Sequence, residues 1–122
     1  MKKIIAVLVL VLGFAFSANA QEVKTVALQQ TKGEFVQKAI TVSEGTYMFE
    51  IENNNVGTEV GFVLLPKGKS ASNPKNHIKE AYVTAPVKNN TKGNTNKVTL
   101  TKGEYTYFCP LNKTPQYTLI VE

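Results

Sequence analysis

Apolar and polar residues alternate in short runs along most of the chain after its first twenty residues. Successive side chains of a β-strand point to opposite faces, so each alternating run predicts a strand with one inward-facing row. The run at 60–65 is apolar throughout and predicts a strand buried on both faces. On the first strand, Gln30 is assigned to the polar face. The expected inward rows are Val26 and Leu28; Val36, Ile40 and Val42; Tyr47, Phe49 and Ile51; Val98 and Leu100; Tyr105, Tyr107 and Cys109; and Tyr117, Leu119 and Val121.

Short polar segments with a central glycine separate several of these runs. Three of them, at 31–34, 43–46 and 101–104, share the order polar residue, charged residue, glycine, polar residue. Glycine supplies the backbone freedom that a tight connection between strands needs. About seven short strands joined in this way predict an all-β domain, either a β-sandwich or a small barrel.

The segment 66–96 departs from this pattern because it is rich in Lys, Asn, Ser and Gly. Within it, 74–83 is expected to form one short helix, with Asn73 as the N-cap and Pro74 at the first helical position. The remainder, 84–96, is expected to be a loop.

The N-terminus has the layout of a cleavable secretory signal peptide over residues 1–20. Two lysines precede an apolar run at 4–16, and Ala18 and Ala20 form a small-x-small cleavage site. The apolar run is short for a membrane span, although an uncleaved N-terminal anchor is the alternative. We therefore expect cleavage after Ala20, a periplasmic or secreted protein, and one domain over 21–122 with no further membrane span.

Composition narrows the choice of partners. The formal net charge is +5, but Arg, Asp and Trp are absent, two lysines belong to the signal peptide, and the others are scattered. Without arginine the chain has no bidentate fork for phosphate or guanine, which argues against nucleic-acid binding. Paired catalytic carboxylates and phosphate-binding loops are also missing from the sequence, so we do not expect an enzyme.

The segment 98–110 resembles the cupredoxins, the blue-copper proteins, in which a strand and a glycine turn precede an aromatic strand that ends in the copper-ligand cysteine. Residues 43–53 resemble the family's strand before its first copper histidine, 57–64 the segment that carries this histidine, and 117–121 the closing strand. The resemblance covers most of 21–122. It implies a Greek-key β-sandwich of about seven strands, with one short helix in a variable connection.

The resemblance also implies a copper site, but this sequence departs from it. A blue-copper site needs two imidazoles and one thiolate, with a weak axial ligand. Cys109 stands at the thiolate position, whereas the first-histidine region holds Thr58, Glu59 and Val60. Residues 110–116 contain neither His nor Met. Both imidazole positions therefore lack a histidine.

Three residues remain as candidate metal ligands: Cys109, Glu59 and His77, the single histidine. Glu59 is considered because some unusual cupredoxins use a carboxylate ligand, and His77 would have to fold back over the loops. Cys109 is also the single cysteine, so an intramolecular disulfide is impossible. Its side chain could be a packed small hydrophobe, one ligand of an atypical or intermolecular metal site, or a reactive thiol.

These observations favour an exported, non-enzymatic binding or structural protein of cupredoxin type that has lost its type 1 copper site and binds no cofactor. Its partner would be another envelope protein or an extracellular ligand. The alternative is a copper-binding protein for electron transfer or copper handling, with Cys109, Glu59 and His77 as ligands. A redox-sensitive thiol protein is the third hypothesis.

Overall fold

The computed structural model describes residues 22–122. The expected signal peptide and its cleavage site therefore lie outside the described residues. Within the described part, none of the helical segments has the length and apolar character that crossing a membrane requires.

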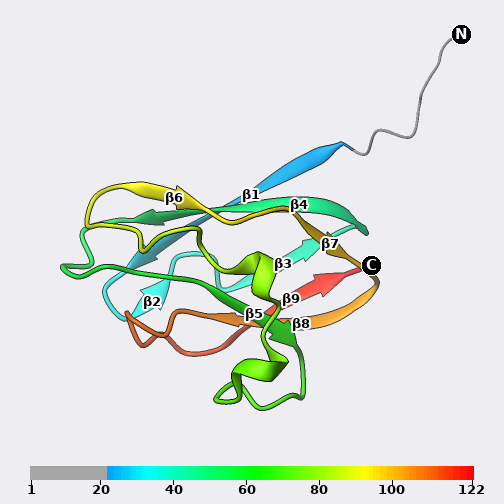
Figure 1. The fold of residues 1–122 in the computed structure, drawn as a ribbon. Coiled ribbons are helices and arrows are strands. Elements are labelled where there is room, and N and C mark those ends of the chain that lie inside the picture. Colours follow the sequence, from blue (N-terminus) through cyan, green and yellow to red (C-terminus); the bar gives the residue numbers. More distant parts are fainter. Residues whose placement is uncertain (1–21) are drawn as a thin grey trace, which may run out of the picture.

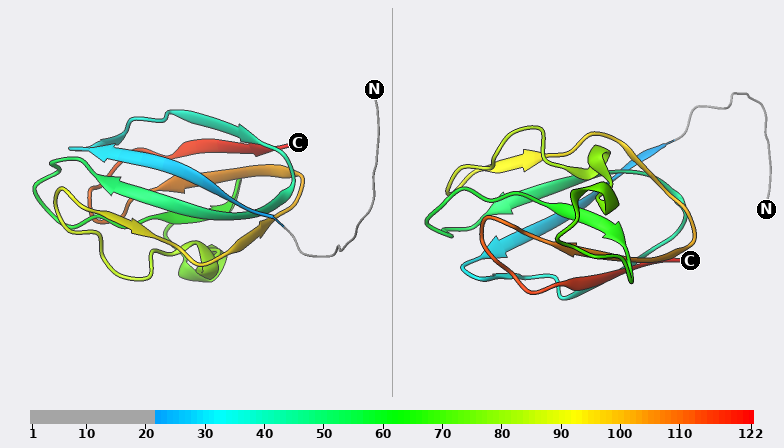
Figure 2. Two further views of the ribbon diagram at one scale, coloured as in Figure 1. Left: turned by 90° about the horizontal axis from the view of Figure 1, so that it is seen from above. Right: turned by 60° about the horizontal axis from the view of Figure 1, so that its bottom comes forward.

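Two β-sheets pack face to face, as the sandwich interpretation requires (Figures 1 and 2). The first sheet has the order β2-β1-β4-β6, with β7 also paired to β4, and the second has the order β3-β9-β8-β5. Nine strands are present in the described residues instead of about seven, because the chain adds short pairings at β2 and β6. The strands are β1 (Val23–Thr31), β2 (Glu34–Phe35), β3 (Ala39–Val42), β4 (Gly45–Asn53), β5 (Val63–Pro66), β6 (Lys92–Asn94), β7 (Val98–Leu100), β8 (Gly103–Phe108) and β9 (Tyr117–Val121).

Strand direction brings several loops to one end of the sandwich. β1 and β4 are parallel over eight residue pairs, from Val23 opposite Thr46 to Gln30 opposite Asn53, so both strands end together. β8 is antiparallel to β5, and its last residue, Phe108, lies opposite Val63, the first residue of β5. The loops after β1, β4 and β8 consequently gather at the end away from the C-terminus (left in Figure 1).

The core confirms most of the expected inward rows. Among the side chains that are 0% exposed are Phe49, Ile51, Tyr107 and Leu119. Gly33 lies in the turn between β1 and β2 with a φ of +81°, a backbone conformation that favours glycine.

One member of an expected inward row was wrong, whereas Ile40 and Val42 of the same row pack against the core. Val36 is 46% exposed, and the neighbouring Phe35 is completely buried in its place. The Phe35 ring packs edge-on against Tyr107 and Tyr117, at centroid distances of 5.2 and 5.7 Å. The larger aromatic ring gains more from burial than a valine would, and the chain bends between β2 and β3 to allow it.

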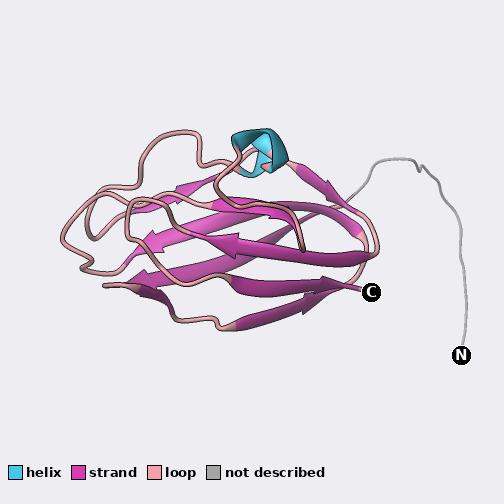
Figure 3. Ribbon diagram, turned by 90° about the horizontal axis from the view of Figure 1, so that it is seen from below, coloured by secondary structure: helices cyan, strands magenta, loops and turns pink. Residues whose placement is uncertain are grey.

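The expected single helix is instead two 3₁₀ turns, η1 (Pro74–Asn76) and η2 (Lys79–Ala81), which lie outside the sheets (Figure 3). The N-cap was correct, because Oδ1 of Asn73 accepts a hydrogen bond from the backbone N–H of Lys75. The helix is interrupted because Ile78 has an extended backbone and donates its N–H to the Leu64 carbonyl on β5. The expected loop at 84–96 also contains β6.

Candidate functional site

The thiol of Cys109 lies at the loop-bearing end of the sandwich, directly after β8, and its side chain is completely buried. The Sγ atom accepts two backbone hydrogen bonds, from the N–H of Gly61 at 3.3 Å and from the N–H of Asn112 at 3.2 Å. These bonds join the segment before β5 to the loop between β8 and β9. The sulfur therefore acts in this fold as a buried hydrogen-bond acceptor.

The loop after Cys109 is closed by further hydrogen bonds. The N–H of Cys109 donates to Oγ1 of Thr114 at 3.0 Å, and the N–H of Thr114 donates to the Cys109 carbonyl at 3.3 Å. The loop thus returns to its own start within five residues, which fixes the backbone around the thiol.

The region expected to carry the first histidine is occupied by structural contacts. Val60 is 0% exposed and exchanges two backbone hydrogen bonds with Val87, at 3.0 and 2.9 Å. Thr58 and Glu59 are exposed. The Thr58 carbonyl accepts a 2.7 Å hydrogen bond from Nδ2 of the buried Asn53.

The region expected to carry the second histidine holds an amide instead. Nδ2 of Asn112 donates to Oε1 of Gln30 at 3.1 Å and to the Thr31 carbonyl at 2.8 Å, and Oδ1 of Asn112 accepts from the N–H of Gly33 at 2.8 Å. Gln30 in turn donates through Nε2 to the Gly61 carbonyl at 2.8 Å. These bonds place Asn112 as a bridge between the loop after β8 and the end of β1.

Sequence reasoning missed the three amide side chains Gln30, Asn53 and Asn112. The assignment of Gln30 to the polar face was wrong, because it is 0% exposed and lies on the same face as Leu28. Residues two apart in a strand share a face, so strict alternation was the signal that could have identified it. Asn112 carried no comparable signal, because its partners lie about eighty residues away in the sequence.

His77 lies in the connection after β5. Its Nε2 donates to the Ala71 carbonyl at 2.7 Å, and Nδ1 forms a 2.7 Å hydrogen bond with the hydroxyl of Tyr82, as the acceptor when the imidazole is neutral. The ring packs edge-on against Phe108 at a centroid distance of 6.2 Å. Phe108 and Cys109 are consecutive and point to opposite faces, so His77 packs on the face that Cys109 does not occupy.

The structure therefore does not bring the three candidate ligands together. Cys109 is buried in the core, Glu59 is exposed, and both ring nitrogens of His77 are in hydrogen bonds. Within residues 22–122, no group of three or more His, Cys, Asp or Glu side chains is arranged to hold a metal ion. A type 1 copper ion needs two nitrogen donors near the thiolate, and this donor set does not fit it.

Comparisons with known proteins agree with the architecture. A family model described as "Cupredoxin-like domain" matches residues 4–121. A comparison with curated protein sequences gave no match.

Three solved structures illustrate the similarity in fold. Auracyanin A, a blue copper protein from Chloroflexus aurantiacus, superposes with a TM-score of 0.64 and 18% identity, covering 83% of this chain and 100% of that chain. Auracyanin from Roseiflexus castenholzii gives a TM-score of 0.62 and 13% identity, covering 81% and 97%. The azurin Az-iso2 from Methylomonas sp. strain J gives 0.53 and 17%, covering 81% and 98%.

Proposed function

This chain belongs to the cupredoxin-like domain family, and from that premise we propose that it is an exported, non-enzymatic binding or structural protein whose type 1 copper site has been lost. The fold and the cysteine position are retained. The nitrogen donors that cupric ion needs beside the thiolate are replaced by groups that hold the loops together. Its partner is another envelope protein or an extracellular ligand.

The observation that carries the proposal is the bonding of Asn112. Its amide makes three hydrogen bonds to the end of β1 and the following turn, so it is a structural bridge in the region where the family carries a histidine. On the other side of the thiol, Val60 is apolar and buried. A copper ion beside Cys109 would have one sulfur donor and no imidazole from either segment.

Burial of the thiol is compatible with the export component of the proposal. A lone cysteine in an oxidising compartment is prone to mispairing unless it is shielded, and Cys109 is 0% exposed. Mass spectrometry of the protein recovered from the periplasm or the culture medium tests this directly. A chain that begins after Ala20 is expected, and an intact N-terminus in the cytoplasmic fraction would contradict export.

The loss of copper is tested by loading the purified protein with Cu(II), removing the excess, and measuring bound metal together with the visible spectrum. We expect no stoichiometric copper and no thiolate-to-copper charge-transfer band. The Cys109→Ser variant serves as the matched control and should give the same result as the unmodified protein. An intense band at one copper per chain that Cys109→Ser abolishes would instead establish the alternative, a copper-binding protein for electron transfer or copper handling.

A further inference from the structure

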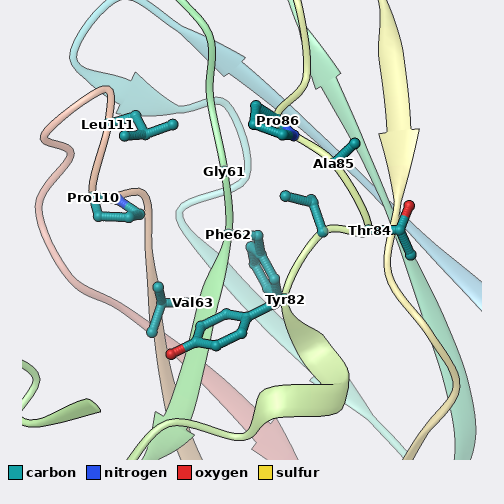
Figure 4. A pocket seen from close by; sticks show the side chains of 10 residues that line it. Gly61, Phe62, Val63, Tyr82, Thr84, Ala85, Pro86, Pro110 and Leu111 are labelled. Atoms are coloured by element: carbon teal, nitrogen blue, oxygen red, sulfur yellow. The ribbon is translucent and has the colours of Figure 1, made fainter.

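A groove with a volume of about 350 Å³ opens beside the segment that precedes β5 (Figure 4). Residues 61–63 form its floor, residues 82–86 one wall, and residues 110–111 the other. The walls are largely apolar, and Leu111 on the rim is 51% exposed. A concave apolar surface of this size is within the range of ligand-binding pockets.

Within the described residues, the backbone of Phe62 on the floor of this groove has no hydrogen-bond partner. On the same edge, Val60 is bonded to Val87, and the Leu64 carbonyl accepts from the N–H of Ile78. Phe62 lies midway between these two points, and the alternation of an extended strand directs its N–H and C=O to the same edge. Among the hydrogen bonds of residues 22–122, none involves the N–H or the C=O of Phe62.

Phe62 has no partner here because the connection between β5 and β6 turns away from this edge. Between Tyr82 and Pro86 the chain pairs with the other sheet, where the N–H of Thr84 donates to the Asn94 carbonyl at 2.9 Å. Phe62 is only 2% exposed, and its ring packs in the core against Phe49 at a centroid distance of 4.9 Å. Phe62 therefore contributes its main chain to the groove. Buried main-chain donors and acceptors are nearly always paired in native proteins, so a group that supplies both partners would be stabilised here.

The floor next to Phe62 has room for an apolar group. A methyl group added at Gly61 would lie 3.9 Å from Leu111 Cδ1 and 3.9 Å from Val83 Cγ2, which is ordinary van der Waals contact. The two side chains thus border the space above Gly61 from opposite walls. An apolar substituent above Gly61 would touch both of them.

We propose that the groove binds one extended residue of a partner polypeptide, whose N–H and C=O pair with those of Phe62 and whose apolar side chain lies between Leu111 and Val83. A peptide combines a donor, an acceptor and an apolar side chain at the spacing of one residue, which is the basis of recognition by strand addition. The small volume restricts the anchor to a single residue. This inference rests on the proposed binding role, but its test does not involve copper, so the two can fail separately.

The test uses the purified ¹⁵N-labelled protein and N-acetyl-leucine N′-methylamide as a minimal peptide probe. Titration should give saturable shifts of the backbone amide signals of Gly61, Phe62 and Val63. N-acetyl-N-methyl-leucine N′-methylamide has the same side chain but lacks the leucine N–H that would donate to the Phe62 carbonyl, so it should bind about tenfold more weakly. Isoamyl alcohol, which lacks both peptide groups, reports on apolar binding alone.

Two variants address the site, and one serves as control. Gly61→Ala adds a methyl group in the bordered space at a backbone without positive φ, and it should abolish saturable binding. Leu111→Ser removes an apolar side chain from one wall. Because Leu111 is exposed, the substitution should not unfold the protein, and it should weaken binding about tenfold. Ile120→Ala removes an exposed apolar side chain from β9, outside the groove, and should leave binding unchanged.

Three results would overturn the proposal. Shifts that rise linearly with probe concentration would mean that the probe does not bind in the groove. Equal binding of the amide and the isoamyl alcohol would make it an apolar small-molecule pocket. Binding that neither variant weakens would place the probe elsewhere on the surface.

Discussion

The side-chain amide of Asn112 donates a 3.1 Å hydrogen bond to Oε1 of Gln30, a side chain that is 0% exposed. Gln30 passes the connection on through Nε2, which donates to the Gly61 carbonyl at 2.8 Å. The side-chain amide of Gln30 therefore links the loop after β8 to the segment before β5. Both segments also donate N–H groups to the Cys109 sulfur, so the amide and the thiol hold the same two pieces of chain.

Removing the Asn112 amide should destabilise the fold. In Asn112→Ala the Oε1 atom of Gln30 stays buried without its donor, and the free energy of unfolding should fall by about 1–3 kcal/mol. Urea denaturation measures the change. Asn96→Ala, at an exposed position, is the control and should have an effect within about 0.5 kcal/mol. In a double-mutant cycle, Gln30→Met and Asn112→Ala should be non-additive, and additive effects would contradict the proposed link.

The Cys109 thiol should react only when the structure opens. Its side chain is 0% exposed, so labelling by a thiol reagent requires local or global unfolding and should accelerate steeply with added urea. The Ile120→Cys variant supplies a matched control, because position 120 is 40% exposed in the unmodified protein. That variant should show one rapidly reacting thiol and one slowly reacting thiol. Rapid labelling of Cys109 in the unmodified protein would support the third hypothesis, a redox-sensitive thiol.

Alkaline pH should destabilise the protein through Tyr107. Burial raises the pKa of the Tyr107 hydroxyl to about 12 from an ordinary value of 10.0, and the neighbouring Tyr117 contributes to the shift. The folded protein keeps this proton at pH values where the unfolded chain loses it. Since the unfolded chain then binds fewer protons, stability should fall as the pH rises from about 10 to about 12.

The measurement is the urea midpoint at several pH values in that range. Tyr107→Phe should lose less stability over the range than the unmodified protein, although it starts about 1 kcal/mol lower, because the hydroxyl donates to the Gln37 carbonyl at 2.6 Å. Tyr105→Phe, which also removes one tyrosine hydroxyl from β8, is the matched control. Identical slopes in all three proteins would show that Tyr107 does not carry the effect.

Local patterns predicted the strands well because a strand's alternation extends over only a few residues. The rows around Phe49 on β4 and Leu119 on β9 were correct for that reason. The bend that exposes Val36 was not predictable, because it depends on the packing of the Phe35 ring against Tyr107, which is remote in the sequence. The helical connection failed in the same way, since Ile78 bonds to β5 instead of continuing the helix.

The same distinction between local and long-range features applies to the candidate site. The absence of histidine from residues 57–60 and 110–116 could be read directly from the sequence, because it concerns only the identity of residues. The hydrogen bonds found there could not be predicted, since Gln30 and Asn112 are 82 residues apart and meet only in the folded sandwich. Sequence therefore shows which residue types these segments contain, and the structure identifies the hydrogen bonds that link them.

Alanine substitution should have different effects on the free energy of unfolding at two glycines, Gly93 beside Val87 and Gly61 on the floor of the groove. Gly93 lies on β6 opposite Ile51, and a methyl group there would come within 2.7 Å of Val87 Cγ2. Val87 is 2% exposed and cannot turn away freely, because a β-branched side chain has few rotamers. Gly93→Ala should therefore lower the free energy of unfolding by about 1–3 kcal/mol through overpacking.

Gly61→Ala is the matched control, because its nearest neighbours would be 3.9 Å away and its φ is not positive. It should be neutral or stabilise the fold by about 0.4–1 kcal/mol, since alanine restricts the unfolded chain. Displacement of Val87 should also weaken its two hydrogen bonds to Val60, so amide exchange at both residues should accelerate in Gly93→Ala. Equal stability of the two alanine variants, with unchanged exchange at Val60, would mean that Val87 accommodates the methyl group and that the packing against β6 is looser than the 2.7 Å approach implies.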